Sequence, residues 1–160
     1  MMRNRIWYTL VETKTNEYYT TSVTRFYQLC EWLTNTFLVI ATSTSVAAWV
    51  TWQKHPLIWI LIIGGSQLVT LIKPFLLFPK YVKTYNEKSV ALQNIACDLE
   101  SLWYQFNREK ITEDEAEQEY NAIKKRLVEN DRFPDEVIVF THKTSLNKAE
   151  ARANSFLSRL

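Results

Sequence analysis

The chain has 160 residues and a formal net charge of +2 at pH 7. This length suits one domain, and so small a charge, without a dense basic run, excludes the electrostatic footprint of a nucleic-acid-binding protein. We therefore expect no direct nucleic-acid binding.

Residues 1–31 are predicted to form a cytoplasmic amphipathic helix. Aliphatic and aromatic residues recur about every three or four positions between polar ones, which is the spacing of one helical face. Threonines in the middle have poor helix propensity, yet we expect the helix to continue into the next segment without a break. Charged residues such as Arg3, Arg5 and Glu12 interrupt any apolar core near the start, so no cleaved signal sequence is expected.

Residues 32–79 are predicted to form a transmembrane helical hairpin. No side chain ionises between Trp32 and Gln53 or between Pro56 and Ile72, and only a short turn separates the two stretches. A helix rises by about 1.5 Å per residue, so each stretch is long enough to cross a hydrocarbon core of about 30 Å. For the second helix this length includes the residues up to Pro79. Cations flank the hairpin mainly toward the chain ends, which predicts that both termini face the cytoplasm.

Both predicted spans carry small and polar residues. Amide side chains need partners in lipid, and the adjacent Gly64 and Gly65 allow close approach of two helix backbones. The two helices are expected either to pack only on each other or to face a water-filled seam among several subunits. Lys73 either extends to the headgroups or lies near the inner mouth of a pore. The candidate pore or interhelical polar residues are Asn35, Thr42, Ser45, Gln67, Thr70 and Lys73.

Residues 80–160 are predicted to be a cytoplasmic helical region that includes a helical hairpin. Its second helix begins at a capping box formed by Thr112 and Glu115. A last amphipathic helix over 145–160 is expected to dock within the subunit or on a neighbour, and Val137–Phe140 fits a short strand or a helical turn. Heptad spacing along the first helix predicts a cytoplasmic oligomer seam of Leu92, Ile95, Leu99, Leu102, Trp103 and Phe106.

No constellation of catalytic residues is apparent in the sequence. Neither His55 nor His142 is paired with a nucleophile or with metal-ligand spacing, and Cys30 and Cys97 form no CxxC motif. The acidic residues at 113–119 are those that a helix dipole favours in a first turn. We therefore predict that the protein is not an enzyme and that it uses no metal and no cofactor.

The elements together predict an all-α membrane protein, and their order resembles that of the SLATT domain family. These are small bacterial membrane proteins with two transmembrane helices and a cytoplasmic helical extension. The resemblance is one of layout across nearly the whole chain. It rests on a polar first helix with Arg25 entering the membrane, a tight hairpin, a long helix with Trp103, a second helix ending near Glu129, and Pro134.

The resemblance implies an inner-membrane effector of a bacterial anti-phage system of the abortive-infection, nucleotide-signalling or retron-like kind. Such an effector would form homo-oligomers and permeabilise the lipid bilayer when activated. The chain has no recognisable ligand-sensing domain, so a separate sensor, nucleotide synthase or reverse transcriptase is the implied partner. The residues also fit an alternative, a membrane-anchored adaptor whose cytoplasmic helices recruit or restrain a soluble partner.

Overall fold

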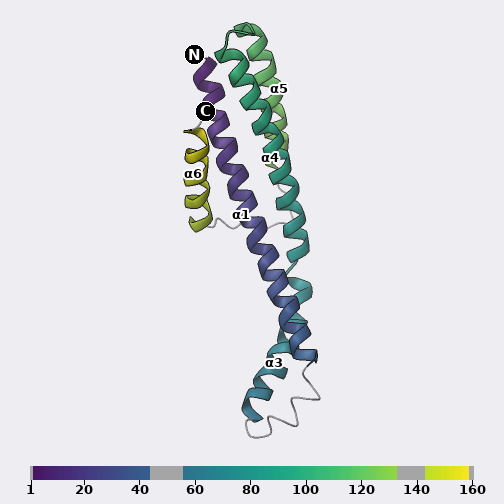
Figure 1. Ribbon diagram of the computed structural model, residues 1–160. Helices are drawn as coiled ribbons and strands as arrows, with labels where there is room; N and C mark the ends of the chain where they lie inside the picture. Colours follow the sequence, from purple (N-terminus) through teal and green to yellow (C-terminus); the bar gives the residue numbers. More distant parts are fainter. Residues whose placement is uncertain (1, 44–55, 133–142, 159–160) are drawn as a thin grey trace. The chain divides into compact units, whose positions relative to one another are not determined.

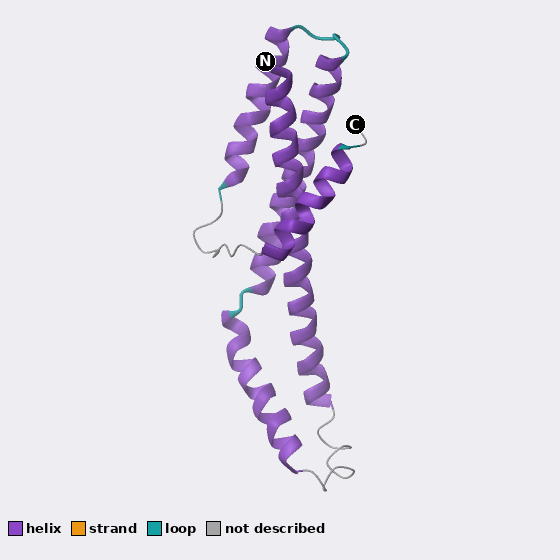
Figure 2. Cartoon of the chain, turned by 90° about the vertical axis from the view of Figure 1, so that its left-hand side faces the viewer, coloured by secondary structure: helices purple, strands orange, loops and turns teal. Residues whose placement is uncertain are grey.

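The computed structural model describes residues 2–43, 56–132 and 143–158 (Figure 1). Over these residues the chain is helical and contains no strand, which confirms the all-α prediction for this part (Figure 2). The segment around Val137–Phe140, where the sequence fits either a strand or a helix, lies outside the described residues. The elements are α1 (Met2–Ser43), α3 (Pro56–Ile72), the short 3₁₀ helix η1 (Lys73–Phe75), α4 (Phe78–Asn107), α5 (Glu113–Asp131) and α6 (Lys143–Leu157).

The chain divides into two compact units. The bundle unit comprises Met1–Thr24 and Lys83–Leu160, and the hairpin unit comprises Arg25–Val82. The N-terminal part of α1 therefore belongs to the same unit as the C-terminal helices, although the sequence places them far apart. The predicted continuity of the first helix is confirmed, because α1 extends from Met2 to Ser43 without interruption.

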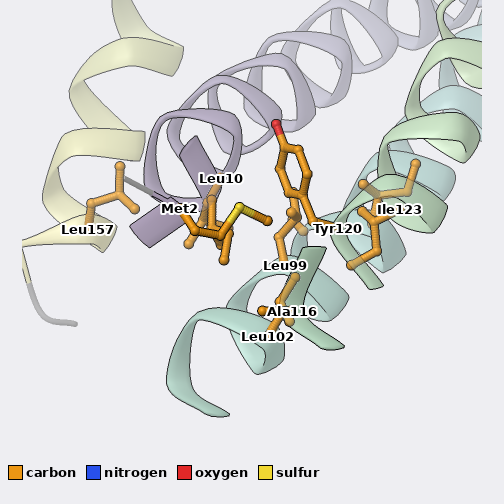
Figure 3. Close-up of a cluster of buried hydrophobic side chains, with 11 residues drawn as sticks. Met2, Leu10, Leu99, Leu102, Ala116, Tyr120, Ile123 and Leu157 are labelled. Carbon is orange, nitrogen blue, oxygen red and sulfur yellow. The ribbon is translucent and has the colours of Figure 1, made fainter. Parts of the chain in front are cut away.

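The bundle unit is built around an apolar cluster to which α1, α4 and α5 each contribute several side chains and α6 contributes Leu157 (Figure 3). Within each helix the buried residues recur three or four positions apart, so that they line one face. The predicted terminal helix is confirmed, and α6 docks within the same chain through Ala149, Ala153 and Leu157. The cluster contains Met2, Ile6, Leu10, Ile95, Ala96, Leu99, Leu102, Ala116, Tyr120, Ile123 and Leu157.

Beyond Leu10 the buried residues of α1 are mostly polar, although Val23 and Tyr27 are also buried. Threonine hydroxyls in this stretch donate to carbonyls of their own helix, as Thr13 does to Thr9 over 2.7 Å and Thr24 to Thr20 over 2.9 Å. Because those hydroxyls are satisfied locally, threonines can be buried without partners from another helix. Lys14 and Glu17 are buried as an ion pair with 3.0 Å between Nζ and Oε2, and Lys14 Nζ lies 4.8 Å from the centroid of the Phe156 ring of α6.

Two local motifs define the connection between α4 and α5. Glu109 adopts a left-handed conformation (φ 54°), and the amides of Glu109 and Lys110 donate to the carbonyls of Phe106 and Gln105, as in a Schellman motif. The predicted capping box is confirmed, with Glu115 N donating to Thr112 Oγ1 over 3.3 Å and Thr112 N donating to Glu115 Oε2 over 2.8 Å. The Thr112 hydroxyl also donates to Glu115 Oε2, over 2.9 Å, and the two hydrogen bonds that this carboxyl accepts, from the Thr112 amide and hydroxyl, lower its pKa.

In the hairpin unit, the chain bends between α3 and α4. Pro74 lies in η1, Leu77 is left-handed (φ 44°), and α4 begins at Phe78. A proline lacks the amide hydrogen that a continuing helix needs and clashes with the preceding turn, which accounts for the interruption. Across the described ranges, no helix by itself is both long and apolar enough to span a membrane. Ile60–Phe75 and Phe78–Asn107, which meet at 46°, satisfy that criterion only as a pair.

Candidate functional site

An open cavity of about 440 Å³ lies beside the bend in the hairpin unit. The cavity is bounded by α1 on one side and by η1 and the beginning of α4 on the other. We refer to it as the bend cavity. Its lining residues are Glu31, Thr34, Asn35, Lys73, Pro74, Leu77, Phe78, Pro79 and Lys80.

The helices place the polar groups of the bend cavity at defined positions. Glu31 and Asn35 are four residues apart in α1 and so share a face of that helix. Between them, the Thr34 hydroxyl donates to the Cys30 carbonyl over 2.8 Å, so its hydrogen is already used. On the other side, the amides of Lys80 and Tyr81 both donate to the Leu77 carbonyl, over 3.0 and 3.1 Å. The first-turn amides of Lys80 and Tyr81 are thus already used within the helix.

Most of the charge in the hairpin unit faces the bend cavity. The described part of residues 25–82 has four ionisable acidic or basic side chains, Arg25, Glu31, Lys73 and Lys80. All of these except Arg25 line the cavity. Two cations and one anion leave the cavity with a positive balance in otherwise apolar surroundings.

The bend cavity contains two of the residues predicted from the sequence, Asn35 and Lys73. Gln67 and Thr70 do not line it and are exposed on α3, where the Thr70 hydroxyl donates to the Ser66 carbonyl over 2.8 Å. The side chain of Thr42 and the whole of Ser45 lie outside the described residues.

Glu31 and Lys80 were missed as site residues because each stands at the edge of an apolar stretch. They resemble ordinary flanking charges in the sequence. The sequence signal that could have identified Glu31 and Lys80 is the scarcity of charged residues between residues 25 and 82.

The two glycines predicted to permit close packing have different surroundings. A Cβ atom on Gly65 would lie 3.9 Å from Phe37 Cζ of α1, whereas a Cβ atom on Gly64 would meet nothing within 4 Å. Gly65 therefore lies at the contact between α1 and α3, and Gly64 faces open space.

The residues of the predicted oligomer seam lie in the core of the bundle unit. Leu92, Ile95, Leu99 and Leu102 are buried, and Trp103 and Phe106 are partly buried against the same cluster. The Trp103 ring lies 5.4 Å from that of Trp7 in α1, measured between centroids. The heptad face is thus covered by helices of the same chain.

The bundle unit has a cavity of its own, of about 510 Å³, between α1, α4 and α5. The Lys88 ammonium at its wall is paired with Asp131, with 3.2 Å between Nζ and Oδ1. Asn130 Nδ2 is buried there, and no acceptor among the described residues receives a hydrogen bond from it. This cavity is a second polar location, separate from the bend cavity.

In the described part of the chain, no group of three histidine, cysteine or acidic side chains is placed to hold a metal ion. Cys30 is half-buried in the hairpin unit and Cys97 is exposed in the bundle unit, and both are free thiols.

No protein-family model, curated protein or solved structure matches this chain. The resemblance to the SLATT domain family therefore rests on the layout of the elements alone.

Proposed function

We propose that this protein is a membrane effector whose hairpin unit inserts into a lipid bilayer. The observation that carries the proposal is the distribution of apolar surface. Of the large hydrophobic side chains exposed in the described part of the chain, all but Tyr8, Val90 and Val128 belong to the hairpin unit. In the described part of that unit, Tyr27 alone is buried. An extensive apolar surface around almost no core is the reverse of a water-soluble domain and suits a lipid environment.

The apolar surface extends along α3 and η1. Leu57, Leu61 and Phe75 expose 73%, 74% and 81% of their area. The 17 residues of α3 rise by about 25 Å, slightly less than a hydrocarbon core of about 30 Å, a mismatch that local thinning of the bilayer accommodates. The cations Lys73 and Lys80 mark one end of this surface, which the positive-inside rule assigns to the cytoplasm. Both termini and the bundle unit accordingly lie on the cytoplasmic side of a bacterial inner membrane.

Effector activity in this proposal comes from association of several copies within the membrane. Gln67 is exposed on α3, and an amide in lipid favours a hydrogen-bonding partner on another helix. The SLATT resemblance supports an anti-phage setting in which a separate sensor, nucleotide synthase or reverse transcriptase triggers the change. Activation then opens a permeable path through the assembled hairpins and halts growth of the infected cell.

Membrane potential in infected cells tests the effector proposal. Cells that express the protein with its genomic neighbours are challenged with phage while a potential-sensitive dye is followed. We expect depolarisation with the wild type and loss of depolarisation with Gln67→Leu, which makes α3 easier to insert and removes the amide. Phe75→Leu, an apolar change on the same surface, is the control. Full protection without any change in potential would contradict the effector proposal.

A second candidate function is that of a membrane-anchored adaptor. It is favoured by the packing of the bundle unit, in which helices of the same chain cover the heptad face of α4. The outer surfaces of the bundle unit are then left for a soluble partner. Exchange of the hairpin for an unrelated two-span anchor separates the two candidates. Retained protection would identify an adaptor, and lost protection with normal accumulation in the membrane would identify an effector.

A further inference from the structure

We infer that the bend cavity binds the headgroup of an anionic phospholipid at the cytoplasmic surface of the membrane. The inference rests on the proposed insertion of the hairpin unit. It goes further by assigning a ligand to one place in that unit and by giving Lys73 and Lys80 a shared role.

The first support is charge complementarity. Lys73 and Lys80 both line the bend cavity, and Glu31 is the one acidic group that lines it. The balance is positive, and a lipid phosphodiester carries the negative charge that complements it. Lysine ammonium groups bind phosphates as compact point charges, and basic pockets between membrane helices on the cytoplasmic side recognise anionic headgroups.

The second support is the apolar part of the lining. Pro74, Leu77, Phe78 and Pro79 provide most of the remaining wall, and Phe75 next to them exposes 81% of its area to the surroundings. A phospholipid presents a phosphate joined to glycerol and acyl chains, so it matches both the cations and this apolar wall. A free phosphate ion matches the cations alone. The shared chemistry is the phosphate group, and the apolar wall selects the lipid as its source.

The third support is size and polarity. A volume of about 440 Å³ holds a headgroup and the first part of an acyl chain rather than a whole lipid. It falls within the range of about 300–1,000 Å³ that is usual for small-molecule sites. The Asn35 amide at the α1 wall provides a donor for a phosphate or glycerol oxygen, which the Thr34 hydroxyl does not, since its hydrogen is given to Cys30.

Native mass spectrometry of the full chain measures the lipid directly. The protein is reconstituted into nanodiscs that contain equal amounts of phosphatidylglycerol and phosphatidylcholine, released, and scored for the lipid that it retains. The test variant combines Lys73→Gln with Lys80→Gln. The control combines Lys125→Gln with Lys143→Gln, which removes the same charge from exposed positions of the bundle unit that do not line the bend cavity.

We expect the wild type to retain phosphatidylglycerol in preference to phosphatidylcholine. The test variant should lose about fivefold in this retention for each lysine removed, as expected for a cation at an anionic surface. The control variant should stay close to the wild type. Equal retention by the test and control variants, or no preference between the two lipids, would overturn the inference.

Two further arms separate the possible failures. A large excess of inorganic phosphate should leave the retained lipid in place, and its displacement would show a phosphate site without lipid selectivity and so overturn the inference. Extraction of membranes with alkaline carbonate reports on insertion itself. Release of the wild-type protein would overturn both the inference and the proposed membrane function, whereas a protein that stays inserted but fails the lipid test would overturn the inference alone.

Discussion

At the scale of single residues, the buried polar stretch of α1 depends on partners that lie close in sequence. Thr13, Thr20 and Thr24 are buried, and each donates its hydroxyl hydrogen to a carbonyl of the same helix. Lys14 and Glu17 neutralise each other one turn apart, with side chains only 9% and 11% exposed. These partners are local, and the stretch is also joined to other helices by a hydrogen bond of 2.7 Å between the Thr21 and Ser89 hydroxyls and by the contact of Lys14 with Phe156.

Removal of one member of the buried ion pair should be more damaging than removal of both. Glu17→Ala leaves the Lys14 ammonium buried beside Phe156, and we expect a loss of about 3–5 kcal/mol in the free energy of unfolding. The double change Lys14→Met with Glu17→Met replaces the charges by apolar groups and should cost far less. Chemical unfolding in detergent, followed by circular dichroism, measures both. A double variant as unstable as Glu17→Ala would contradict this account.

The left-handed residue that ends α4 predicts a stabilising change. Glu109 has φ 54°, a conformation that costs an ordinary side chain about 1 kcal/mol and costs glycine almost nothing. Glu109→Gly should therefore raise the free energy of unfolding by about 1 kcal/mol. Gln105→Gly, within α4, should lower it by a similar amount because glycine is a poor helix former. Thermal unfolding of the two variants side by side checks the opposite signs.

At the scale of the elements, the bend after α3 and the contact between α1 and α3 organise the hairpin unit. The Tyr27 ring of α1 stacks on the Tyr81 ring of α4, with centroids 5.0 Å apart and planes inclined by 14°. Farther along, Gly65 of α3 meets Phe37 of α1. These two contacts join α1 to the segments before and after the bend, and the bend cavity lies within the same unit.

A matched pair of glycine substitutions tests the contact between α1 and α3. Gly65→Leu adds three carbons beyond a Cβ that would already contact Phe37 Cζ at 3.9 Å, and we expect a destabilisation of about 1–3 kcal/mol from overpacking. Leucine at position 64 projects into open space, so it should be neutral or stabilising. Both changes increase helix propensity equally, and their difference therefore isolates the packing term. Thermal unfolding in micelles gives the comparison, and equal effects would show that Phe37 does not pack at Gly65.

At the scale of the whole molecule, the proposed topology places the two units in different environments. The hairpin unit has its apolar side chains outside, and the bundle unit has them inside. The first arrangement is stable in hydrocarbon, where exposed apolar groups cost nothing, and the second is stable in water. The position of one exposed thiol in the bundle unit makes this assignment testable.

Cys97 reports on the side of the membrane that the bundle unit occupies. It is exposed on α4, and a Cys30→Ser change leaves it as the sole cysteine of the chain. A membrane-impermeant maleimide should label this variant in inside-out vesicles and leave it unlabelled in intact spheroplasts. Lysed spheroplasts provide the control for accessibility. Labelling of intact spheroplasts would contradict cytoplasmic placement.

Much of the local structure could be predicted because its causes lie within a few residues. The pairing of Thr112 with Glu115 is a property of one helical turn, and the end of α5 at Asp131 follows from turn-forming residues before Pro134. The apolar spacing that predicts a buried face at Leu92 and Leu99 was likewise sufficient to identify that face. Spacing contains no information on what covers such a face, and the structure places helices of the same chain there.

The candidate site depended more strongly on tertiary structure. Asn35 and Lys73 were recognisable as polar residues in apolar stretches, but their place in one cavity with Glu31 and Lys80 required the bend at η1 and the approach of α1. The sequence by itself determined the helices, the cap at Thr112 and the contrast between an apolar hairpin and polar flanks, because these follow from neighbours along the chain. Only the tertiary structure decided which helices share a core and which charges meet, because those contacts join residues tens of positions apart.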